Sequence, residues 1–331
     1  MADNDARSRH DKVGGTIRRA KRSLDFFEAR RDRALERLKN EDIVRPRGEC
    51  LYIGITDIQL ERDEIVVLGG AKPNTIIRRV EEPPGEVELA QALRKEDTWR
   101  FGYLAAYART ITHELITPIW DDQPQGALNL AWAITSLMRI RSRGQFIAPA
   151  YCNVPWSTVA AIEDHSVAIG LLDEYPKAIR FDDPPAFASD DFAWVSDQLD
   201  NWFGVWEIES FRLAAESYWS YYHHPNPRMM VANLWSGIEA LFNHRMELRF
   251  RLALSIASLV EPRGPTRIAL YKKIVKLYDG RSVIVHGQSM SDAKIHEHIS
   301  EASGILARLL EACINRGTVW SEEEVTASLM S

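Results

Sequence analysis

The sequence predicts an α+β protein that is predominantly helical, with a mixed α+β N-terminal region followed by an all-α antiparallel helical bundle. Short Ile/Val-rich runs bounded by Pro and Gly, which are typical of strands, occur between residues 51 and 80 and again at 167–172. From Asp190 onward the hydrophobic residues keep a helical period almost without interruption. The 331 residues suffice for about two domains of roughly 100–200 residues each. A composition of 45% hydrophobic and 27% charged residues excludes collagen, coiled-coil fibres and wholesale disorder.

The first predicted element is an exposed, highly charged helix over residues 15–41. Apolar residues recur in it at helical spacing, and Arg, Lys, Asp and Glu fill most other positions. The apolar residues are Leu24, Phe27, Ala34 and Leu38. The simpler interpretation is a solvated helix that docks by this thin stripe. The alternative is an arm that contacts RNA, because residues 1–47 carry 14 Lys/Arg against 9 Asp/Glu.

The next region, residues 48–188, is expected to be α+β. Its Ile/Val-rich runs predict a small meander of strands, and two later segments have helical periodicity. The expected strands are 51–60, 64–68, 75–80 and 167–172, and the expected helices are 86–116 and 126–141. A turn-rich stretch, Asp182-Asp183-Pro184-Pro185, marks the domain boundary.

The region 189–316 reads as amphipathic helices joined by short connections, which favours an antiparallel bundle. The expected helices are 190–222, 227–243, 245–260, 265–286 and 292–316. The predicted organisation is therefore a charged helical arm (1–47), an accessory or recognition region (48–188), a bundle (189–316) and a C-terminal tail (317–331).

Most common catalytic signatures are absent from the sequence. It has no phosphate-binding glycine loop, no G-x-G-x-x-G, no H-E-x-x-H and no G-x-S-x-G. Three histidine clusters lack metal-ligand spacing, so the simplest interpretation is surface or loop histidines. These are His113-Glu114, His223-His224 and His296-Glu297-His298. We therefore expect no metal and no cofactor.

Compartment and membrane contact follow from similar observations. The three cysteines are far apart and odd in number, which argues against a disulfide framework and favours a reducing cytoplasm. No apolar run approaches the ~18–20 residues that span a bilayer. We expect a cytoplasmic protein that does not contact the membrane.

The net charge of −6 hides a second basic zone at 245–281. Nine Lys/Arg there face only Glu247, Glu261 and Asp279. Such a zone suits a phosphodiester ligand. The residues that we expect to contact RNA are Arg245, Arg249, Lys272, Lys273 and Lys276.

This zone leads into an unusual helix face. Leu270, Ile274 and Leu277 step by four and three, and the next position on that apolar stripe is Arg281. A guanidinium there must find a partner or line a groove. His286 continues the adjacent stripe and could flank the same cleft, whereas residues 283–285 are expected to be buried. The turn-favouring pair 279–280 is a competing signal, because a helix break there would take Arg281 off the stripe.

Three segments together resemble the Apea-like branch of the HEPN superfamily. They are LWSGIEALFN, RFRLALSIASLV and LYDGRSVIVHG, within a match that covers about 190–316. The shared positions include Trp235, Glu239, Tyr278, Ser282 and Gly287, beside Arg281 and His286 in the R-x4-H motif. The resemblance implies metal-independent RNA cleavage in a composite site formed by dimerisation, in which His286 handles protons and Arg281 binds the scissile phosphate. It also implies a prokaryotic role in anti-phage defence or as a toxin.

Several assignments stay open at this point. Ser282 either hydrogen-bonds the phosphate or is a plain helix-surface serine, and Glu239 pairs with either Arg281 or Arg245. The whole module is either a ribonuclease or a catalytically silent HEPN-like module that binds RNA, a nucleotide or a protein. The N-terminal region is expected to recognise a trigger, substrate or regulatory partner.

Overall fold

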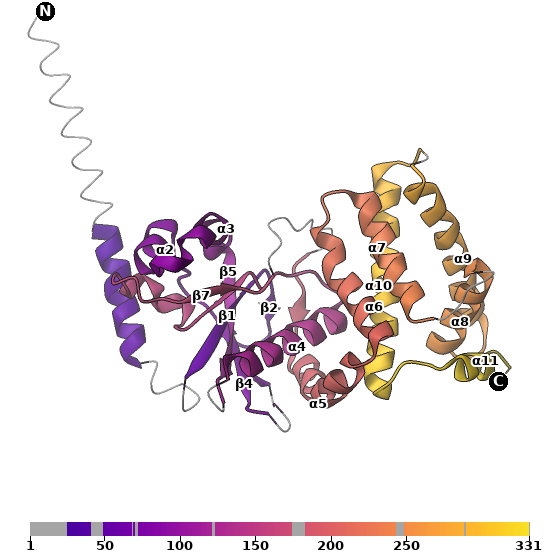
Figure 1. Ribbon diagram of the computed structural model, residues 1–331, viewed down its shortest axis with the longest axis horizontal. Helices are drawn as coiled ribbons and strands as arrows, with labels where there is room; N and C mark the ends of the chain where they lie inside the picture. Colours follow the sequence, from indigo (N-terminus) through magenta and orange to yellow (C-terminus); the bar gives the residue numbers. More distant parts are fainter. Residues whose placement is uncertain are drawn as a thin grey trace, which may run out of the picture.

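The computed structural model describes residues 25–40, 49–67, 69, 72–120, 123–173, 183–242, 248–287 and 289–330. Strands lie in the first part of this chain, and every element from Ser189 onward within the described residues is a helix. Figure 1 shows the sheet and the helical region side by side, with the N-terminal helix of residues 25–40 beyond the sheet. The predicted α+β, predominantly helical class is confirmed.

The main sheet is antiparallel throughout and has the order β3-β4-β5-β1-β6-β7. Its strands are β1 (Cys50–Thr56), β3 (Glu64–Val67), β4 (Thr75–Arg79), β5 (Ile111–Pro118), β6 (Ala150–Cys152) and β7 (Ile169–Leu171). A second, two-stranded parallel pair joins β2 (Gln59–Leu60) to β8 (Ala186–Phe187). The expected strands are therefore present, but β5 separates β4 from β1, so the sequential meander was wrong.

The strand β5 is the largest departure from expectation, since residues 86–116 were predicted to be helical. Only α2 (Glu86–Ala92), α3 (Phe101–Tyr107) and short 3₁₀ turns at 95–100 and 108–110 precede it. Seven of its eight residues are buried, on both faces of the sheet. Burial on both faces removes the alternation of polar and apolar residues by which strands are recognised.

The helix α4 (Pro124–Ser142) joins the two regions, as Figure 1 shows. It contacts β1 and β5 on one side and α5 and α10 on the other. One buried cluster runs from the sheet through α4 into the helical region. A smaller cluster covers the opposite face of the sheet, beneath α2, α3 and the 3₁₀ helix at Trp156–Ala161.

The helical region matches the predicted segments closely. It contains α5 (Ser189–Trp206), α6 (Glu209–Ser220), α7 (Pro227–Ala240), α8 (Leu248–Val260), α9 (Pro265–Val285) and α10 (Asp292–Arg316). The predicted helix 190–222 is instead two helices, divided at 207–208 and followed by a 3₁₀ turn at Tyr221–His223. The tail carries a further helix, α11 (Glu322–Met330), which packs on α8. The helix α10 is central, because α4 to α9 all contact it.

The N-terminal helix docks beside α2 through both apolar and ionic contacts. Ala34 is buried, and Arg30 bonds the Glu88 carboxylate at 2.7 Å. Arg33 and Arg37 both pair with Glu82, at 2.9 Å each. These arginines therefore face protein carboxylates. Of the predicted apolar stripe, Ala34 is buried but Phe27 is exposed, so ion pairs contribute to a docking that was expected to be apolar. Residues 15–24 and 41–47 lie outside the described residues.

Candidate functional site

The helix α9 forms one continuous surface helix, and the pair Asp279-Gly280 does not interrupt it. Leu270 and Ile274 are buried and Leu277 is half-buried, so the predicted stripe leads to Arg281 without a break. The expectation that residues 283–285 are all buried was wrong. Only Ile284 is buried, whereas Val285 is 40% exposed, because the last turn of α9 extends beyond its neighbours' cover.

Arg281 is anchored to the end of α7. Its Nη2 lies 3.2 Å from Oε1 of Glu239, so Arg281 is the partner of Glu239 that the sequence left open. The alternative partner of Glu239, Arg245, lies outside the described residues. The guanidinium carbon is also 5.4 Å from the Tyr278 ring centroid, a distance suited to a cation–π contact. The Arg281 side chain is still 29% exposed, so it is positioned yet open to a ligand.

Burial and charge oppose each other at Glu239. Burial raises the pKa of this carboxyl above its ordinary value, while Arg281 and a hydrogen bond with Tyr278 lower it, and burial prevails. Burial and the nearby Glu239 charge also raise the pKa of Tyr278. The Tyr278 hydroxyl is therefore protonated near neutrality and lies close enough to Glu239 to affect the pKa of its carboxyl. The three side chains form one connected group that fixes the guanidinium.

His286 lies directly after the last residue of α9 and its side chain faces solvent. Its backbone N–H bonds the Ser282 carbonyl at 3.1 Å, and Gly287 then adopts a φ of 74° to end the helix. Arg228, at the start of α7, donates to the Ile284 carbonyl at 2.6 Å. Ser282 is exposed one position after Arg281. The end of α9 thus presents an imidazole to solvent on a well-anchored turn.

The basic residues expected to contact RNA divide into two groups. Arg249 pairs with Asp279 at 2.6 Å, and Lys273 pairs with Glu301. Lys272 and Lys276 are exposed and make no ion pair within the described chain. Arg245 lies outside the described residues. The structure therefore leaves two of the four described candidates available to a polyanion.

A cavity of about 310 Å³ lies between α9 and α10, and one of its lining residues, Gly280, directly precedes Arg281. The lining residues are Lys273, Lys276, Leu277, Gly280, Met290, Lys294, Glu297, His298 and Glu301. His298 was expected at the surface or in a loop, but it is only 5% exposed within α10. Burial lowers the pKa of His298 to about 4. A signal for this was present, since His298 shares the buried helical face of Ile295, Ile299 and Ala302.

The same correction applies to two other histidines. His113 lies on the strand β5 and His223 in a 3₁₀ turn, and both are buried. Burial lowers the pKa of each to about 4, with the Arg79 charge adding to the effect at His113. Neither is the surface or loop histidine that its sequence neighbourhood suggested.

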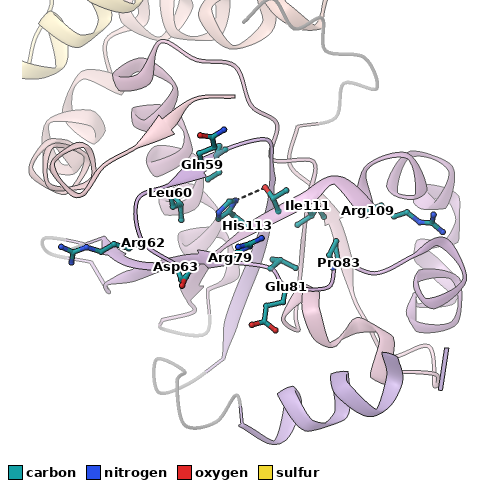
Figure 2. A pocket seen from close by; sticks show the side chains of 13 residues that line it. Gln59, Leu60, Arg62, Asp63, Arg79, Glu81, Pro83, Arg109, Ile111 and His113 are labelled. Carbon is teal, nitrogen blue, oxygen red and sulfur yellow. Dashed lines mark hydrogen bonds between the residues drawn. The ribbon is translucent and has the colours of Figure 1, made fainter. Parts of the chain in front are cut away.

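A larger cavity, about 570 Å³, opens in the N-terminal region. Figure 2 shows Arg79 and His113 near its middle, with Arg62 and Arg109 at opposite ends. The Thr112 hydroxyl lies 2.9 Å from Nδ1 of His113, the contact dashed in Figure 2. Carboxylates of Asp63 and Glu81 also line it. The arginines do not converge on one point, so the geometry at α9 is the better candidate for chemistry.

Other kinds of site find little support in the described part of the chain. Within it, no three His, Cys, Asp or Glu side chains are grouped to hold a metal ion. All three cysteines are buried, and burial raises the pKa of Cys152 well above its ordinary value and that of Cys313 to about 12. Such thiols are poor nucleophiles. Among the described helices, none combines the length and apolar character needed to cross a bilayer.

Comparisons with known proteins add no relatives. No protein-family model matches the chain, and no curated protein or solved structure matches it either. The function proposed below therefore depends on the chemistry of the end of α9.

Proposed function

We propose that the protein is a metal-independent endoribonuclease of the HEPN type, which acts as a homodimer with Arg281 and His286 in a composite site. One observation carries the proposal: a guanidinium held by Glu239 and Tyr278 lies five residues before a solvent-facing histidine at one exposed helix end. The resemblance of the surrounding motif to Apea-like domains supports the same assignment. It also suggests a prokaryotic cytoplasm and a role in anti-phage defence or as a toxin.

The two side chains suit transesterification of RNA. A base takes the proton of the ribose 2′-OH, the 2′-oxygen attacks phosphorus, and the bond to the 5′-oxygen breaks as an acid protonates that oxygen. The products are a 2′,3′-cyclic phosphate and a free 5′-OH. Histidine, with an ordinary pKa of ~6.5, serves as either base or acid near neutrality. The Arg281 fork stabilises the charge that develops on the phosphorane.

One histidine per chain does not supply both proton transfers, so a second copy completes the site. His286 lies 18 positions after Ile268, near the start of α9, which corresponds to about 27 Å along the helix axis at ~1.5 Å per residue. Two His286 side chains therefore meet only if the twofold axis passes near the C-terminal end of this helix. Exposed apolar side chains are present at that end. Val285 is 40% exposed, and Met229, next to the Arg228 that bonds Ile284, is 52% exposed. They would pack in the dimer contact.

The direct test compares His286→Ala and Arg281→Ala with wild type in RNA cleavage with EDTA present. We expect each variant to lose about 10²–10⁴-fold in rate, the usual contribution of general acid–base or charge-stabilising groups. The control is His296→Ala, at an exposed histidine of α10 outside this helix end, which should cleave like wild type. A purified wild type that cuts no RNA, or variants that match it, would refute the ribonuclease assignment.

A silent binding module is the second candidate, and the Arg281–Glu239 pair favours it, because that pair already neutralises the arginine. Such a module would bind RNA, a nucleotide or a protein without cleaving it. It predicts that Arg281→Ala lowers thermal stability rather than an enzymatic rate. Under either function, residues 48–188 are proposed to recognise a regulatory partner, and Lys272 and Lys276 to contact RNA.

A further inference from the structure

The cavity between α9 and α10 holds a buried hydrogen-bond donor that the catalytic proposal does not use. Trp235 lies on α7, is fully buried, and its Nε1 is 2.8 Å from Nε2 of His298. An indole N–H only donates, so Nε2 of His298 must be the acceptor. Burial keeps the imidazole neutral near pH 7, because its pKa falls to about 4. A neutral ring that accepts at Nε2 carries its proton at Nδ1.

The Nδ1–H group has no partner within the described chain, and Gly280 lies close to it without a side chain that would cover it. An ideal Cβ on Gly280 would lie 3.1 Å from Nδ1 and 3.4 Å from Cε1 of His298. Both residues line the cavity. Gly280 is helical rather than a turn residue, so what it provides is space over this nitrogen. A side chain there would cover the donor.

The rim of the cavity carries more positive than negative charge. Lys276 and Lys294 are exposed and make no ion pair within the described residues. Lys273 pairs with Glu301, and Glu297 is the remaining carboxylate. A neutral N–H donor beneath two unpaired ammonium groups suits an oxyanion, since a phosphate accepts several charge-assisted hydrogen bonds at once. The carboxylates of Glu297 and Glu301 disfavour a dianion in the cavity, whereas a phosphodiester carries a single negative charge.

We infer that this cavity binds a phosphodiester group of an RNA strand, with Nδ1–H of His298 and the ammonium groups of Lys276 and Lys294 as donors. Gly280 connects it to the candidate catalytic end, because it directly precedes Arg281 on α9. The cavity would thus hold a phosphate flanking the one that is cut and position the strand. That the ligand is an RNA strand rests on the proposed function, whereas the arrangement of the hydrogen-bond donors does not.

The test measures affinity for a 2′-O-methyl RNA oligonucleotide, which binds but cannot undergo transesterification. Gly280→Ala is the key variant, because the added Cβ would cover Nδ1 at 3.1 Å. The gain in helix propensity of about 1 kcal/mol over glycine opposes the cost of this tight contact, so a thermal unfolding curve of the variant accompanies each binding measurement. We expect about tenfold weaker binding, the loss of one good hydrogen bond to a charged group. Gly304→Ala on α10 is the matched control, since an added Cβ there meets nothing within 4 Å.

The lysines provide a second comparison. Lys276→Gln and Lys294→Gln should each weaken binding about threefold to tenfold and reduce its salt dependence. Lys95→Gln, at an exposed lysine of the N-terminal region that does not line the cavity, should leave binding almost unchanged. In wild type labelled at the histidine nitrogens, the His298 Nδ1–H resonance should shift as the oligonucleotide is added.

The outcomes separate this inference from the proposed function. Strand binding that depends on Gly280 in a protein without cleavage activity would support the cavity while the ribonuclease assignment fails. Cleavage and binding unchanged in Gly280→Ala, with no shift at His298, would overturn the cavity. Inorganic phosphate or a nucleoside monophosphate that binds as tightly as the strand would overturn the strand assignment.

Discussion

The helices α4 and α9 each carry an arginine among apolar positions, but they use it differently. Eleven of the 19 residues of α4 are buried, against three of the 21 in α9. The side chain of Arg139 on α4 is 2% exposed, whereas that of Arg281 on α9 is 29% exposed. The helix α4 is enclosed by the sheet and the bundle, and α9 lies at the end of the molecule away from the sheet (Figure 1). An arginine enclosed on all sides, such as Arg139, has a structural role, whereas one on a helix packed on a single side, such as Arg281, remains available to a ligand.

The contacts of Arg139 show what full enclosure requires. Its Nη2 is 2.5 Å from a carboxylate oxygen of Asp173, and its Nε donates to the Phe146 carbonyl at 3.3 Å. Its guanidinium carbon lies 4.7 Å from the Phe146 ring centroid. The same Asp173 oxygen accepts from the Ala148 N–H at 2.7 Å. This group closes the connection between α4, the sheet and the segment after β7.

The largest effect should come from removing the enclosed arginine. Arg139→Met is expected to lower the free energy of unfolding by about 3–5 kcal/mol, because it leaves the nearly buried Asp173 carboxylate without its cation. Arg281→Met should cost no more than about 1 kcal/mol, since solvent screens the half-exposed pair. Urea unfolding of the two variants checks the difference. Equal losses would mean that Arg281 is as structural as Arg139.

A smaller loss of folding stability is expected at acid pH. His113 in the sheet and His298 in the bundle have a pKa of about 4 when folded, below the ordinary value of about 6.5. Between these values the unfolded chain binds more protons, so stability is complete above pH 6.5 and falls as pH drops toward 4. Each histidine should cost about 1 kcal/mol between pH 7.5 and 5.5.

Urea unfolding at these two pH values measures this loss, and His113→Gln or His298→Gln should flatten the dependence. His286→Gln is the matched control, because that side chain faces solvent. A pH dependence that is unchanged in both buried-site variants would contradict burial of these two imidazoles as its cause. Protonation of His298 would also remove the acceptor of the Trp235 N–H, so strand binding is best measured near neutral pH.

What the sequence could predict depended on how many faces of an element are buried. The sequence was sufficient to predict the stripe of α9, because this helix is buried on one side only; the stripe consists of Leu270, Ile274, Leu277 and Arg281. The strand β5 was missed because neighbours cover both of its faces. His298 was missed because its nearness in sequence to His296 suggests a polar cluster, whereas its helical position places it on one face with Ile295 and Ala302. The break between α5 and α6 was missed because residues 207–208 include neither Pro nor Gly, the residues that usually mark the end of a helix.

The partner of Glu239 was a different kind of problem. Pairing of Glu239 with Arg281 or with Arg245 was equally compatible with the sequence, and only the packing of α7 against α9 brings Arg281 to it. The role of Gly280 was hidden for the same reason. Its neighbour in space, His298, lies 18 residues away on another helix, so a local pattern suggested a turn where the structure has a helical glycine close to a histidine nitrogen.

The smallest predicted effect concerns where α9 meets a second copy. Val285→Gln should weaken a homodimer about threefold, or about 0.7 kcal/mol, by removing an apolar contact beside the expected twofold axis. Ile268→Gln is the matched control, because Ile268 is even more exposed, at 57%, but lies at the opposite end of the helix. Sedimentation equilibrium gives both dissociation constants. Cleavage by Val285→Gln should recover at protein concentrations above its dissociation constant, since the catalytic groups are intact. An unchanged Val285→Gln dimer, or one weakened only by Ile268→Gln, would move the twofold axis away from His286 and with it the composite site.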